Sequence, residues 1–287
     1  MNIVTTKLRR FAPRRKAHVI PGFGLSVGVT ITLISLIVVI PLLSVLVALS
    51  GISWREFWGI VTDKMVLHAY QVSFVCSLIA AVVNCVFGLL LAWVLTRYKF
   101  PGRRILDGLI ELPFALPTAV AGIALTTIYA DQGWIGKIFA PLGIKISYTQ
   151  VGITIALIFI GIPFVVRSVQ PVLEKLDSQY EEAAQMLGAS RVRTFFKVLM
   201  PELLPALLTG FGLAFSRGLG EYGSVVFIAG NIPYKTQIAP LLIMGKLEQF
   251  SYAGATSIAL VMIVIAFILL FSINFIQSHM NKAAKNN

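Results

Sequence analysis

Residues 177–201, DSQYEEAAQMLGASRVRTFFKVLMP, hold the most informative pattern in the chain. Ser178 and Glu181 form an S-x-x-E capping box, which predicts that a helix begins immediately after the serine. Gly188 suits the C-cap of that helix, because glycine tolerates the left-handed backbone conformation. Ser190 can cap a second short helix, which stops before the proline that ends the segment. The stretch therefore predicts a compact helix–turn–helix, called here the knob (residues 178–201).

The first helix of the knob carries a thin apolar stripe. Its apolar residues recur at i, i+3, i+4 and i+7: Tyr180, Ala183, Ala184 and Leu187. Because two of the four are alanines, another surface can approach this stripe closely. The alternative is an ordinary amphipathic helix on the lipid surface, which Glu181 and Glu182 disfavour because anionic headgroups repel carboxylates.

The rest of the chain is strongly apolar. Of its 287 residues, 57% are hydrophobic and 13% are charged, which a soluble fold with a polar shell does not accommodate. Six segments reach the ~20 residues needed to cross a bilayer: 23–49, 66–96, 108–129, 148–170, 203–229 and 251–277. The predicted fold class is an all-α membrane protein with six transmembrane helices.

The distribution of basic residues predicts the orientation of these spans. The two tails and alternate connections hold 17 Lys and Arg, and the connections of the opposite face hold six. By the positive-inside rule, both termini and the knob lie in the cytoplasm. The net charge of +12 is explained by this orientation and not by nucleic-acid binding. The predicted organisation is a basic cytoplasmic tail (1–22), a six-helix transmembrane domain (23–277) with the knob on its cytoplasmic side, and a cytoplasmic C-terminal tail (278–287).

The fifth segment carries two ionisable residues at membrane depth. Arg217 and Glu221 stand four residues apart on one helical face, which allows a mutual ion pair. Charged groups in a membrane face the bundle interior or a water-filled path, so both residues, with Gly220 and Tyr222, are candidates for lining a translocation path. The alternative is a buried structural pair.

Two prolines open the third segment. Pro113 and Pro117 remove backbone donors and share a helical face, so this end is a candidate gate or kink. The alternative is a static kink with Glu111 paired to a nearby arginine.

Catalytic and metal-binding patterns are missing from the sequence. The cysteines, Cys76 and Cys85, are nine residues apart and suit packing, and the three histidines are far apart. No G-x-x-x-x-G-K-[ST] phosphate loop occurs, so the chain is not expected to hydrolyse ATP. A membrane-embedded enzyme and an ATP-independent channel remain as distant alternatives.

The knob resembles the EAA loop of bacterial ABC-importer permeases. Glu182, Ala183, Ala184, Gly188 and Pro201 match that motif at its spacing. The motif's Ile and Leu are replaced by two other apolar residues, Val198 and Met200. The resemblance implies a type I ABC importer permease bundle, similar to the molybdate permeases, in the bacterial inner membrane. It also implies that the knob seats on a separate ATPase and couples transport to it.

A second resemblance concerns cargo. Residues 216–231, SRGLGEYGSVVFIAGN, are similar to the T-type subunit of the sulfate/thiosulfate permeases. This similarity implies a W-type second permease subunit, two ATPase subunits and a periplasmic sulfate- or thiosulfate-binding protein as partners. It implies no cofactor on this chain, with ATP and Mg used by the ATPase. A permease for molybdate, tungstate or another oxyanion is the alternative.

Overall fold

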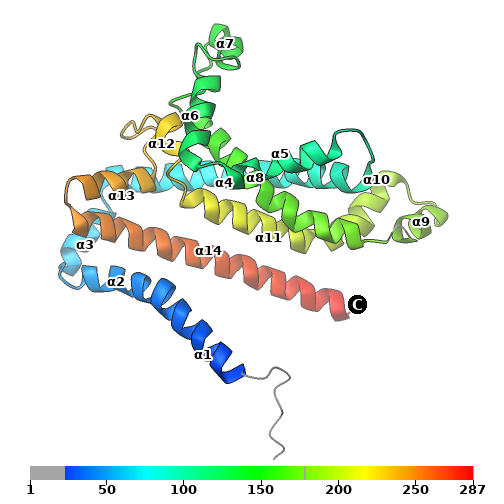
Figure 1. Ribbon diagram of the computed structural model, residues 1–287, viewed down its shortest axis with the longest axis horizontal. Coiled ribbons are helices and arrows are strands. Elements are labelled where there is room, and N and C mark those ends of the chain that lie inside the picture. Colours follow the sequence, from blue (N-terminus) through cyan, green and yellow to red (C-terminus); the bar gives the residue numbers. More distant parts are fainter. Residues whose placement is uncertain (1–22, 178, 287) are drawn as a thin grey trace, which may run out of the picture. The chain divides into compact units, whose positions relative to one another are not determined.

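The computed structural model describes residues 23–177 and 179–286, and these residues form helices and loops without a strand (Figure 1). The tail 1–22 and Ser178 lie outside them. Five helical runs in this part of the chain are long and apolar enough to cross a membrane, and one bent helix pair gives a sixth span. The runs are Phe23–Leu49, Lys64–Arg97, Gln150–Lys175, Arg191–Leu219 and Tyr252–His279, and the pair is Arg103–Ala115 with Thr118–Tyr129. The predicted six-span, all-helical fold is confirmed.

The first span is a compact unit of its own. It consists of α1 (Phe23–Ile34), a π-turn, η1 (Ser35–Val39), and α2 (Ile40–Leu49). In the π-turn the N–H of Ile40 donates to the carbonyl of Ser35, five residues back. Pro41 follows at once. A proline ring clashes with the carbonyl four residues before it in a regular helix, and the wider π-turn relieves that clash.

The second unit, from Leu49 onward, is built on three helices that pack side by side: α4 (Lys64–Arg97), α8 (Gln150–Lys175) and α11 (Met200–Leu219). Glycines bring them close. A methyl group on Gly88 of α4 would lie 2.7 Å from Cγ1 of Val165 in α8. One on Gly210 of α11 would lie 2.7 Å from the Cα of the same valine. Small residues at such crossings let helix backbones approach closely within a membrane.

Three further helices complete this unit around the outer end of α4: α3 (Trp54–Val61), α13 (Ala239–Glu248) and α14 (Tyr252–Asn286). A small core joins them to α4, and it includes Val66, Leu242 and Ile258. Two short elements, α7 (Gly136–Phe139) and η2 (Ala140–Leu142), lie in the connection before α8.

Two of the predicted spans are interrupted, the third where a kink was a candidate and the fifth where a continuous helix was predicted. The third predicted span, 108–129, is split into α5 (Arg103–Ala115) and α6 (Thr118–Tyr129), which are bent by 113°. The fifth predicted span, 203–229, ends at Leu219 and resumes only as the short α12 (Val225–Ala229). A proline in the third segment and the Gly220–Gly223 turn in the fifth break the backbone hydrogen-bond ladder.

The two interruptions pack against each other. A methyl group on Gly122 of α6 would collide with the backbone of Ser224, and one on Gly223 would collide with Oγ1 of Thr118. Close contact of this kind needs glycine on one side. The break in the third span therefore shapes the loop that follows α11.

Candidate functional site

The first helix of the knob is capped at both ends by residues that flank it in the sequence. In α9 (Gln179–Met186), Oδ1 of Asp177 accepts from the N–H of Gln179 at 3.1 Å. The predicted capping box needs Ser178, which lies outside the described residues, so that part stays a prediction. At the other end Gly188 has φ +80°. Its N–H donates to the backbone carbonyl of Gln185, and the N–H of the next residue donates to the backbone carbonyl of Ala184. This is a Schellman motif, and the predicted C-cap is confirmed.

The second helix of the knob begins as predicted and ends differently. The hydroxyl of Ser190 accepts from the N–H of Arg193 at 3.4 Å at the start of α10 (Arg191–Thr194). The helix was predicted to stop before Pro201, and that is wrong. It continues through a π-turn, η3 (Phe195–Leu199), into α11, and Pro201 lies in the first turn of α11. As in the first span, the π-turn accommodates the proline ring that follows it.

The apolar stripe of α9 is uncovered. Leu187 is 89% exposed and Tyr180 is 60% exposed, and Ala183 is also exposed. Met186, next to this stripe, is 90% exposed. Glu182 is exposed as well. A methyl group added at Gly188 would meet no other atom within 4 Å. An exposed apolar patch of this kind is typical of surfaces that contact another protein or a membrane.

Arg217 and Glu221 form the predicted ion pair, with Nη1 and Oε2 2.8 Å apart. The Glu221 side chain is 1% exposed and that of Arg217 is 39% exposed. The second carboxylate oxygen of Glu221 accepts from both the N–H and the hydroxyl of Ser224, at 2.9 and 3.0 Å. Both carboxylate oxygens are therefore engaged, one by Arg217 and the other by the turn between α11 and α12. Part of the Arg217 side chain stays exposed.

The other two path candidates lie elsewhere on the same turn. Gly220 and Tyr222 line an apolar cavity of about 310 Å³ between α11, α13 and α14. Arg217 and Glu221 are not in its lining. The structure thus separates the four candidates into a polar pair and an apolar pair.

The gate candidates frame the break of the third span. Pro113 is buried inside α5, and Pro117 precedes the first residue of α6. Leu116 is extended, with ψ 137°, as expected for a residue before proline. The kink itself is present, and motion at this point stays a prediction.

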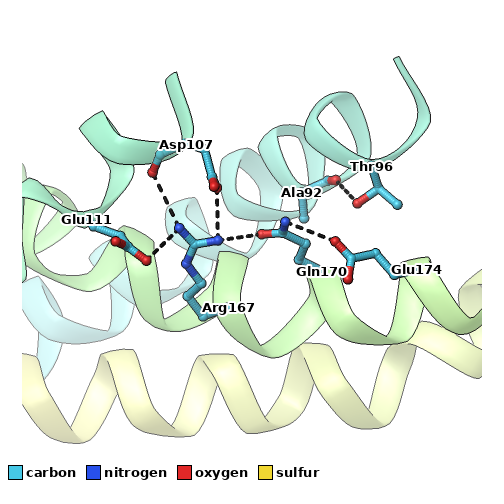
Figure 2. A network of polar contacts seen from close by, with 7 residues as sticks. All are labelled: Ala92, Thr96, Asp107, Glu111, Arg167, Gln170 and Glu174. Carbon is cyan, nitrogen blue, oxygen red and sulfur yellow. Dashed lines mark hydrogen bonds and ion pairs between the residues drawn. The ribbon is translucent and has the colours of Figure 1, made fainter. Parts of the chain in front are cut away.

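An ion-pair cluster fixes α5 to α8 beside this break (Figure 2). Arg167 of α8 contacts Oδ1 of Asp107 at 2.9 Å and Oε1 of Glu111 at 2.7 Å. It also donates to Gln170 at 2.7 Å, and Gln170 donates to Glu174 at 3.2 Å. The pairing of Glu111 with an arginine, which belonged to the alternative of a static kink, is present. Asp107 was not singled out in the sequence, although its i, i+4 spacing from Glu111 places both acids on one face.

The knob and the polar pair lie at opposite ends of α11, because the knob leads into its first turn and Arg217 stands in its last (Figure 1). A helical bundle with broken spans and an exposed knob before the fifth span is the architecture of an importer permease. The comparisons with known proteins agree. A family model described as binding-protein-dependent transport system inner membrane component matches residues 84–286. The chain belongs to this family.

Relatives and solved structures extend that match. The sulfate transport system permease protein CysT of Salmonella typhimurium is 50% identical over 265 residues, which cover 92% of this chain and 96% of that protein. Its counterpart from Escherichia coli K12 is 48% identical over the same shares. A bacterial ABC transporter involved in alginate import has a TM-score of 0.74 at 14% identity, over 90% of this chain and 96% of that one. The MetNI methionine ABC transporter has a TM-score of 0.56 at 17% identity, over 80% and 99%. This chain is a multi-pass inner-membrane permease subunit of an ABC importer.

Proposed function

We propose that this chain is the T-type permease subunit of a sulfate importer. The assignment of sulfate as the cargo rests on the near-50% identity of this chain, over 92% of its length, to proteins named as sulfate transport permeases. The proposed assembly contains a W-type second permease subunit, two ATPase subunits and a periplasmic sulfate- or thiosulfate-binding protein. No cofactor is proposed on this chain, and ATP and Mg belong to the ATPase.

The proposed coupling surface is the exposed face of the knob. Glu182, Ala183 and Ala184 stand on α9, and Gly188 ends it. The uncovered apolar stripe suits a groove in a soluble partner, because apolar surface exposed to water favours burial. Pro201 lies at the point where the knob becomes α11. A shift of the knob is therefore a shift of a core helix.

The proposed path residue is Arg217, supported by Glu221. A partly exposed guanidinium at membrane depth faces water or the bundle interior, and it supplies positive potential to an oxyanion. Because Glu221 neutralises part of this charge, the dianion is attracted without being held tightly. Gly220 and Tyr222 shape the adjoining turn, and Pro113 and Pro117 make the facing break a candidate gate.

Sulfate uptake tests the cargo. In cells lacking this subunit, its return should restore uptake of labelled sulfate, and excess molybdate should compete poorly. Restoration of molybdate uptake without sulfate uptake would reassign the cargo to the molybdate and tungstate class. Co-purification with an ATPase tests the coupling proposal independently of cargo.

Cysteine accessibility tests the path. In a chain with Cys76 and Cys85 replaced by alanine, Arg217→Cys should react with a water-soluble thiol reagent. Phe271→Cys is the control, because this apolar side chain of α14 is 73% exposed and suits contact with lipid. Equal labelling of the two positions would remove Arg217 from the path.

A further inference from the structure

The first helix of the knob, α9, has little support from the bundle, in contrast to η3, where Leu199 is buried. A cleft of about 330 Å³ opens between Tyr180 of α9 and residues of α8 and α11, among them Val172, Lys175 and Glu202. No side chain of α9 belongs to the cores of the bundle described above. Movement of α9 therefore reaches the spans through a small number of contacts.

One of these contacts is an ion pair between α9 and the end of α4. Nη2 of Arg97 lies 2.8 Å from Oε1 of Glu181, and the two side chains are only 23% and 26% exposed. Arg97 is the last residue of α4, where the helix dipole favours a cation. Partial burial also reduces screening by salt. This pair is distinct from the exposed Glu182 of the coupling motif.

The last turn of α4 also contacts the second helix of the knob. The guanidinium carbon of Arg97 lies 5.6 Å from the centre of the Trp93 ring. That ring meets Phe195 edge to face, with centroids 5.5 Å apart. Arg97 thus contacts α9, and Trp93 contacts η3. The end of α4 touches both arms of the knob.

This turn is rigidly joined to the rest of the unit. Ala92 and Leu95, on either side of Trp93, are 0% and 1% exposed and lie in the core shared with α8 and α11. A displacement applied at Arg97 must therefore move packed side chains of the three-helix core.

We propose that Arg97 and Glu181 are positioning residues that transmit the movement of α9 to α4. The proposal rests on the proposed coupling role of the knob. In it, the ATPase moves the exposed face of α9, and the ion pair makes α4 follow. α11 follows through its own continuity with the knob. With the pair broken, α11 alone is driven, and ATP hydrolysis no longer produces a full rearrangement of the path.

The experiment is a charge swap in the purified transporter, reconstituted in vesicles with its binding protein and ATPase. Sulfate uptake and ATP hydrolysis are measured in the same vesicles for Arg97→Glu, Glu181→Arg and the double variant. Each single variant should keep the ATPase in the complex and lose about tenfold in sulfate transported per ATP. The double variant should recover most of that ratio, because the opposite charges meet again.

A matched control is the ion pair Lys145–Asp131, which joins exposed loop residues 3.7 Å apart. Exchanging its charges should leave the ratio unchanged. An unchanged ratio in Arg97→Glu and Glu181→Arg would overturn the proposal. So would loss of the ATPase from the single variants without recovery in the swap, since the pair would then serve assembly. Failure of the proposed function is seen separately, in the unmodified complex, as absence of a bound ATPase or of ATP-dependent uptake.

Discussion

Glu221 holds Ser224 by two hydrogen bonds to one carboxylate oxygen, 2.9 Å to the N–H and 3.0 Å to the hydroxyl. The other oxygen of the same carboxylate pairs with Arg217. One buried side chain therefore closes the turn after α11 and positions the guanidinium. This geometry makes Glu221 structural and leaves part of the Arg217 guanidinium exposed, as the proposed path role requires.

Replacing Glu221 by alanine should destabilise the protein more than replacing Arg217 by glutamine. The alanine leaves the buried N–H of Ser224 without its acceptor, which costs about 1–3 kcal/mol. Thermal unfolding in detergent measures the difference. Arg217→Gln should fold and lose sulfate uptake instead. Equal stability of the two variants would contradict this division of roles.

The contact of Gly88 and Gly210 with Val165 predicts a selective rescue. Alanine at either glycine should cost about 1–3 kcal/mol by overpacking the helix crossing. Replacing Val165 by glycine should relieve Gly88→Ala, because the added methyl group would meet Cγ1 of the valine at 2.7 Å and its Cβ at 2.8 Å, and glycine lacks both atoms. It should not relieve Gly210→Ala, which meets the Cα. Gly108→Ala is the control, since that helical position has open space. Unfolding temperatures of the five variants check the pattern.

Arg167 should be sensitive even to a conservative change. Lysine has one ammonium group and lacks the planar fork that reaches Asp107 and Glu111 together. Arg167→Lys should therefore loosen α5 from α8, seen as faster proteolysis at the 97–104 turn. Glu111→Gln keeps the pair with Asp107 and should have a milder effect. A milder effect of Arg167→Lys than of Glu111→Gln would refute the bridging role.

Gly188→Trp should abolish ATPase binding and transport while leaving membrane insertion intact. The position has φ +80° and open surroundings, so the large side chain adds strain and blocks the coupling surface. Gly188→Ala separates the two effects, because it adds strain with little bulk. Gly143→Trp is matched in backbone, with φ +71° and open space, and lies in a different loop. It should keep the ATPase. Normal transport by Gly188→Trp would disprove the coupling assignment.

The sequence predicted local features well. The caps at Gly188 and Ser190 depend on the few residues around them. Arg217 and Glu221 pair as predicted, but they do not share a helical face, because α11 ends at Leu219 and Glu221 lies in the turn beyond it. The number of spans followed from hydropathy.

Features that depend on distant residues were missed. The pairing of Arg167 with Asp107 could not be predicted, because the two residues are 60 positions apart and no periodicity links them. The pair Arg97–Glu181 left no signal in the sequence for the same reason. A kink near Pro117 was expected, but its 113° angle and the close approach of Gly122 to Ser224, about 100 residues along the chain, were not. The continuation of the knob into α11 was missed because a π-turn has no sequence signature beyond the proline after it.

The π-turn at Phe195–Leu199 also sets the direction, around the axis of α11, in which the exposed face of α9 and α10 points. A π-turn holds one residue more than the α-helical register, and each residue advances a helix by about 100° and 1.5 Å. Deleting one residue here would keep every cap and every contact within α9 and α10. It would nevertheless swing their exposed face about 100° around the axis of α11. The one extra residue of this turn thus determines which side of α11 the exposed face of the knob lies on.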